Sequence, residues 1–187
     1  MFKPLFIILL LILSLSGCND DKQIEENINI ALSSDIKGFD PVLSTDVRTG
    51  KIISLVYDNL VSFGDSTEIV PGIAKRWSLG NDRKTYTFFL RKNAFFHDGT
   101  PITSKGVLFS LERLANPKNL SPQVWLLENI EGLDNYILGK NNNISGIKII
   151  NDTLIQIKLK KPFSPFIQFL AMPATAIVNA RNVNNIS

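Results

Sequence analysis

A single cysteine among 187 residues is the feature that most restricts what this chain can fold into. One thiol cannot form an intramolecular disulfide, and with only one histidine beside it the chain offers no zinc finger and no Cys–His catalytic pair of the usual kind. The folded part must therefore be held by an apolar core, and the hydrophobic content of 44% is ordinary for a globular protein. The length suits one domain or at most a domain and a half.

Charge distribution and motifs exclude several classes of function. The 20 basic side chains are scattered apart from short clusters such as 75–76 and 158–161, so we expect a solvated surface and no nucleic-acid partner. His97 precedes Asp98-Gly99-Thr100-Pro101, which is typical of a turn, and no nucleophile or metal ligand is spaced to join it. The chain also has no glycine-rich phosphate loop. The sequence therefore predicts a protein that is not an enzyme and has no cofactor and no metal.

Residues 1–17 predict a lipoprotein signal peptide. The apolar run of residues 5–15 is too short to span a bilayer, which takes about 20 residues. It ends in Leu15-Ser16-Gly17-Cys18, which resembles the lipobox of bacterial lipoproteins. We expect Cys18 to carry the lipid and the polar residues 18–27 to form a tether. The alternatives are a plain signal peptide or an uncleaved anchor with an incidental cysteine.

Apolar periodicity divides the rest of the chain into strands and helices. It predicts strands over 28–32, 84–91, 147–150 and 153–159, and helices over 47–60, 104–114, 131–138 and from 165 onwards. Thr103 and Ser164 are expected to cap their helices, and Asn151-Asp152 is expected to form a type I′ hairpin turn. This alternation predicts an α/β fold class with a mixed sheet.

Six different short motifs follow one another along the chain. They are Gly38–Pro41, Val56–Val61, Ile69–Trp77, Tyr86–Arg91, Phe96–Thr103 and Val107–Leu111. In this order they resemble the N-terminal region of the family 5 extracellular solute-binding proteins, the oligopeptide- and dipeptide-binding components of ABC importers. The resemblance covers residues 28–180. It departs from the family at Gly106, where an acidic residue is usual, so we expect a weakened first turn in that helix.

The resemblance implies the N-terminal part of a two-lobed fold like that of periplasmic binding proteins. Residues 28–60 would begin lobe I, residues 61–165 would form an extra subdomain typical of the family, and residues 166–187 would return into lobe I. The family's greater length implies that lobe II is missing here. We therefore expect this chain alone to bind peptides poorly or not at all, and we expect uncovered apolar surface near Ile177 and Val178.

The function implied by the resemblance is that of a membrane-tethered, extracytoplasmic lipoprotein. It would capture oligopeptides or dipeptides in the periplasm, or at the outer face of the cytoplasmic membrane, for ABC permease subunits. The implied ligand-binding residues are Thr45, Asp46, Val47, Gln123 and Trp125. Asp46 equally suits a helix N-cap and Trp125 a packing anchor. The alternative function is that of a truncated lipoprotein or interaction module, without a role in transport, from a disrupted gene.

We predict that replacing Cys18 by serine abolishes lipid attachment, because the thiol is the group that would be acylated. Labelling of cells with a clickable fatty acid should mark the wild-type protein and leave Cys18→Ser unmarked. Equal labelling of the two proteins would contradict the lipoprotein interpretation.

Overall fold

The computed structural model describes residues 30–32, 35–36 and 38–183, and it divides into one unit of residues 1–33 and another of residues 34–187. The prediction of a strand over 28–32 is wrong for the residues described there, because 30–32 have no regular secondary structure. A strand requires a hydrogen-bonded neighbour, and no strand pair in the described part of the chain includes these residues. Cys18, with the predicted signal peptide and tether, lies outside the described residues.

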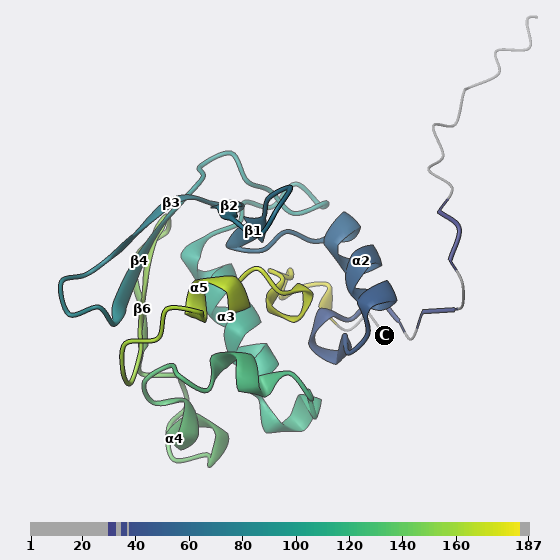
Figure 1. The fold of residues 1–187 in the computed structure, drawn as a ribbon. Coiled ribbons are helices and arrows are strands. Elements are labelled where there is room, and N and C mark those ends of the chain that lie inside the picture. The colour runs from purple at the N-terminus through teal and green to yellow at the C-terminus, as the bar shows by residue number, and fades with distance from the viewer. Residues whose placement is uncertain (1–29, 33–34, 37, 184–187) are drawn as a thin grey trace, which may run out of the picture. The chain divides into compact units, whose positions relative to one another are not determined.

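The second unit contains a four-stranded sheet in the order β3-β4-β6-β5 and a separate hairpin of β1 and β2 (Figure 1). Every strand pair within the described residues is antiparallel. The strands are β1 Val61–Phe63, β2 Ile69–Pro71, β3 Ala74–Leu79, β4 Thr85–Leu90, β5 Ile147–Asn151 and β6 Leu154–Lys158.

Helices accompany these strands, so the predicted α/β class is confirmed, whereas the sheet predicted to be mixed is antiparallel throughout the described strands. The α-helices are α2 Val47–Val56, α3 Ser104–Ala115, α4 Leu133–Ile137 and α5 Phe166–Phe169. The 3-10 helices are η1 Pro41–Leu43, η2 Pro117–Asn119, η3 Val124–Leu127 and η4 Pro173–Thr175.

The hydrophobic core lies between the sheet and the helices on one side of it (Figure 1). The alternation predicted for β4 is confirmed, since Tyr86, Phe88 and Leu90 are buried on one face. Phe88 and Ile155 of β6 are cross-strand partners and point into the same core. From α3, the side chains of Val107, Leu111 and Leu114 complete it. Each fully buried side chain of this size contributes about 1.5–3 kcal/mol to folding.

Helix α2 ends at Val56, four residues before the predicted end at residue 60. Tyr57 has extended backbone angles, and the chain turns there towards β1. Asn59 sets this path, because its side-chain amide donates hydrogen bonds of 2.7 Å to the carbonyl of Met172 and 2.9 Å to Thr175 Oγ1. A contact 113 residues away in the sequence thus overrides the helical periodicity.

Three local predictions need correction. In the β5–β6 hairpin, Asn151 pairs with Leu154, so the loop residues are Asp152-Thr153. None of them has a positive φ, which a type I′ turn requires; instead Asn151 Oδ1 accepts a hydrogen bond of 3.0 Å from the Thr153 N–H. Thr103 stands at the N-cap of α3 but makes no capping hydrogen bond through its side chain. Helix α5 begins after Pro165, and Ser164 does not cap it.

The segment after η4 is covered, which contradicts the expected exposure of Ile177 and Val178. Both side chains are only 2% exposed. The Ile177 N–H donates to the Asp58 carbonyl at 2.9 Å, and the Val178 N–H donates to Ser110 Oγ of α3 at 2.9 Å. These bonds draw the segment into the core that the rest of the unit already forms.

Within the described residues, the helices fall short of the length and apolar character needed to cross a membrane.

We predict that Gly106→Ala raises the free energy of unfolding by about 0.5–1 kcal/mol, because alanine favours a helix and restricts the unfolded chain. A Cβ at this position would lie 3.5 Å from Phe96 Cζ, an ordinary van der Waals distance. Urea denaturation measures the change. The matched control is Gly132→Ala, which should be destabilising because Gly132 has a φ of 81° and its Cβ would collide with Ser145. A lower stability of Gly106→Ala would contradict the assignment.

Candidate functional site

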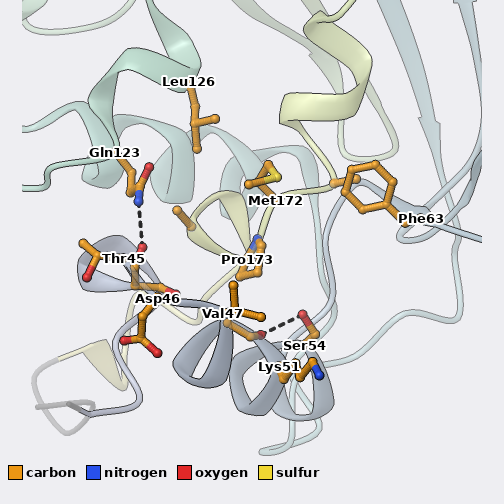
Figure 2. A pocket seen from close by; sticks show the side chains of 14 residues that line it. Thr45, Asp46, Val47, Lys51, Ser54, Phe63, Gln123, Leu126, Met172 and Pro173 are labelled. Atoms are coloured by element: carbon orange, nitrogen blue, oxygen red, sulfur yellow. Dashed lines mark hydrogen bonds between the residues drawn. The ribbon is translucent and has the colours of Figure 1, made fainter. Parts of the chain in front are cut away.

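A pocket of about 350 Å³ opens where three separate segments meet α2 (Figure 2). We call it the α2 pocket. Its walls come from the loop before α2 and α2 itself, from η3, from the chain around η4, and from β1. The lining residues are Ser44, Thr45, Asp46, Val47, Gly50, Lys51, Ser54, Phe63, Gln123, Leu126, Ala171, Met172, Pro173 and Ala174. Its volume falls within the range of small-ligand sites, about 300–1,000 Å³.

The loop before α2 is held by a nearly buried ion pair. Arg113 of α3 donates from Nη1 and Nη2 to the two carboxylate oxygens of Asp40, at 2.7 and 2.6 Å. The two side chains are 10% and 15% exposed. Asp40 also caps η1, since its Oδ1 accepts a hydrogen bond of 3.2 Å from the Val42 N–H. The first wall of the pocket is thus attached to the helix that packs on the sheet.

Two further bonds join this loop to the segment that precedes η3. Gln123 Nε2 donates to the Ser44 carbonyl at 2.9 Å, a bond drawn in Figure 2. Ser121 Oγ donates to the Val42 carbonyl. Both bonds link residues 79 apart in the sequence. They set the Gln123 side chain against the loop, at the edge of the pocket.

Four of the five residues implied as ligand contacts lie together at this pocket. Thr45, Asp46, Val47 and Gln123 line it, and Trp125 does not. Trp125 lies next to them, because its Nε1 donates to Gln123 Oε1 at 2.9 Å. Its ring also packs edge-on against Phe169 with 5.2 Å between centroids, although 46% of the residue is exposed. The packing role of Trp125 is therefore present, and a ligand role for all five residues stays a prediction.

The carboxylate of Asp46 forms the N-cap of α2, which confirms the alternative role expected from the sequence. Its Oδ1 accepts from the backbone N–H groups of Arg48 and Thr49 at 3.1 and 3.0 Å, and its Oδ2 accepts from Thr49 Oγ1 at 2.8 Å. The backbone and side-chain hydrogen bonds from Thr49 lower the pKa of Asp46 below its ordinary value. The carboxylate that lines the pocket thus already accepts three hydrogen bonds from the protein itself.

One face of α2 forms a wall that the sequence reasoning did not assign. Val47, Gly50, Lys51 and Ser54 follow the spacing of a single helical face, and all four line the pocket. Helical periodicity counted from Val47 could have found this face. At Gly50 a Cβ would lie 3.2 Å from Pro173 Cγ, so the glycine lets α2 approach η4 closely.

The residues of the opposite wall were not predicted from the sequence either, for a different reason. Phe63, Met172 and Pro173 come from β1 and the η4 region, and only the tertiary fold brings them to α2 (Figure 2). No local pattern in the sequence marks them. The resulting wall is apolar, so the pocket combines an apolar interior with polar groups at Thr45 and Gln123. Groups of three or more potential metal ligands are absent from the described part of the chain.

Comparison with known proteins shows to which family this chain belongs. The model of the family described as bacterial extracellular solute-binding proteins, family 5 Middle, matches residues 68–186. The chain belongs to this family. The resemblance inferred from the short motifs is thus confirmed.

Relatives in this family include peptide-binding proteins. The chain is 34% identical over 149 residues to the periplasmic murein peptide-binding protein MppA of Escherichia coli, covering 78% of this chain and 28% of MppA. It is 30% identical over 148 residues to the periplasmic oligopeptide-binding protein OppA of the same organism, covering 78% of this chain and 27% of OppA. The chain thus spans little more than a quarter of these relatives.

Solved structures agree with the sequence comparison. The unliganded open form of MppA matches with a TM-score of 0.73 and 33% identity, covering 79% of this chain and 29% of the MppA chain. The expected fold class is therefore confirmed, and this chain matches a part of the MppA structure.

We predict that Asp46→Asn lowers the free energy of unfolding at neutral pH and that the difference disappears in acid. Asparagine caps helices about as well as aspartate does through its Oδ1, so the change removes the charge and, with Oδ2, the acceptor of the hydrogen bond from Thr49 Oγ1. Because the folded-state pKa is lowered from 3.8, the carboxylate stabilises the protein fully above that value. This stabilisation is lost as pH falls through the lowered pKa.

Urea denaturation of both proteins from neutral to strongly acidic pH measures the effect of Asp46→Asn. The control is Asp65→Asn, at an exposed carboxylate in the β1–β2 turn that caps no helix in the described structure. A pH-independent loss of stability in Asp46→Asn would contradict the role of the charge.

Proposed function

We propose that this chain provides one wall of the ligand site of a peptide-binding protein that serves an ABC importer. The observation that carries the proposal is the α2 pocket, built by segments around residues 44–47, 123–126 and 171–174 in a chain of family 5. The relatives MppA and OppA are named for binding murein peptide and oligopeptides. The permease that would receive the ligand is part of the same proposal.

The chemistry of the pocket suits a peptide. An extended peptide has backbone groups that need hydrogen-bond partners and side chains that need tolerant pockets. The exposed loop at Thr45 and the Gln123 side chain offer polar groups beside an apolar wall. The chain spans 28% of MppA, so we propose that a second wall, the family's lobe II, closes over the ligand from outside these 187 residues.

The proposed location is the outer side of the cytoplasmic membrane, with the protein attached through lipid on Cys18. The support is the lipobox-like sequence Leu15-Ser16-Gly17-Cys18. Two or more acyl chains give stable attachment, whereas a single chain binds only marginally. Such an anchor would keep the pocket close to a permease in the same membrane.

We predict that Ser54→Trp blocks peptide binding, because Ser54 lines the pocket and is exposed enough to accept a large side chain without disturbing the core. The matched control is Leu55→Trp at the neighbouring position of α2, which is 68% exposed and does not line this pocket. Titration of the soluble protein from Asn19 onwards with tripeptides, followed by amide NMR shifts, measures binding in the millimolar range expected of a single wall.

The wild-type protein and Leu55→Trp should show saturable shifts at residues 44–54 and 123–126, and Ser54→Trp should not. Equal shifts in both tryptophan variants would place the ligand elsewhere. Absence of saturable shifts in the wild type would remove the peptide-binding proposal and favour the interaction module without a transport role. Micromolar or tighter binding would contradict the proposal that a second wall is needed.

A further inference from the structure

Two charged side chains, Asp46 and Lys51, line the α2 pocket, and they differ in how many polar contacts they make with other residues of the protein. Asp46 accepts three hydrogen bonds from Arg48 and Thr49 as the cap of α2. Lys51 forms no ion pair within the described structure, where the ion pairs involve other residues. Figure 2 shows Lys51 beside Ser54 on α2, with Val47 between it and Asp46. The pocket therefore offers one cation, Lys51, that forms no ion pair with another described residue.

The interior behind this cation is apolar. Phe63, Leu126, Met172 and Pro173 line it, and Gly50 contributes no side chain that would fill it. A volume of about 350 Å³ leaves room for one large apolar side chain of a ligand. Polar side chains of that size would lose hydration there without finding matching partners.

We propose that the α2 pocket selects ligands in which a carboxylate stands next to an apolar side chain, as it does in the C-terminal residue of a peptide. The apolar side chain enters the cavity, and the carboxylate pairs with the ammonium group of Lys51 at its rim. The inference rests on the proposed function and specifies which end of the peptide, and which kind of residue, this wall recognises.

The ion pair with Lys51 and the burial of the apolar side chain contribute unequally to the binding affinity. Lys51 is exposed, and exposed ion pairs contribute modestly, so the carboxylate is expected to strengthen binding about two- to fivefold. Burial of a large apolar side chain contributes more, about tenfold or above. Salt screens the charged part and leaves the apolar part in place.

The experiment compares three tripeptides on the soluble protein from Asn19 onwards, with dissociation constants taken from amide NMR shifts. The probes are Ala-Ala-Phe, its C-terminal amide and Ala-Ala-Ala. Ala-Ala-Phe should bind about two- to fivefold more tightly than its amide and about tenfold more tightly than Ala-Ala-Ala. The preference for the free carboxylate should vanish in molar salt.

Variants of Lys51 test the residue itself. Lys51→Met should bind the acid and the amide equally, whereas Lys51→Arg should keep the preference. The control is Lys105→Met, at an exposed lysine of α3 that does not line the pocket, and it should behave as the wild type.

Saturable shifts at the pocket with equal affinity for acid and amide in the wild type would overturn the role of Lys51 and leave the peptide-binding function standing. A preference that persists in Lys51→Met would do the same. Equal affinity for Ala-Ala-Phe and Ala-Ala-Ala would overturn the apolar part. Absence of binding by every peptide would remove the inference together with the proposed function.

Discussion

The ion pair between Arg113 and Asp40 is the interaction on which the rest of the site depends. Two hydrogen bonds of 2.7 and 2.6 Å join α3 to the loop before α2 with little exposure to solvent. Such a pair contributes little to net stability by itself, but loss of one partner leaves a buried charge and costs about 3–5 kcal/mol. The geometry of the loop is therefore tied to the position of α3.

This tie explains how an exposed pocket can have a defined shape. Helix α3 is fixed on the sheet by buried residues such as Val107 and Leu111. Through Asp40 the loop follows α3, and through Gln123 the segment before η3 follows the loop. Thr45 and Lys51, which would meet the ligand, are thus exposed residues on a preformed support. Preformed sites lose less conformational freedom on binding than mobile ones.

The sequence predicted those parts of the fold that depend on local patterns. The alternation in β4 and the periodicity of α3 were sufficient because one face of each is buried. Strand β3 carries Lys75-Arg76 and alternates poorly, so it was missed, and the end of α2 depends on the distant partners of Asn59. Four pocket residues followed from the family resemblance. The apolar wall at Phe63 and Met172 could not be predicted, because only tertiary packing brings it to α2.

Native-state hydrogen exchange of the wild type and Asp40→Asn tests the central claim, that the ion pair holds the pocket loop on the core. The N–H groups of Leu43 and Ser44 bond within η1 at 3.2 and 3.0 Å, and those of β4 report the sheet. The β4 amides should exchange slowest in both proteins. In Asp40→Asn the Leu43 and Ser44 amides should exchange at least about tenfold faster, with a smaller change in β4. Unchanged rates at Leu43 and Ser44, or an equal acceleration in β4, would contradict the claim.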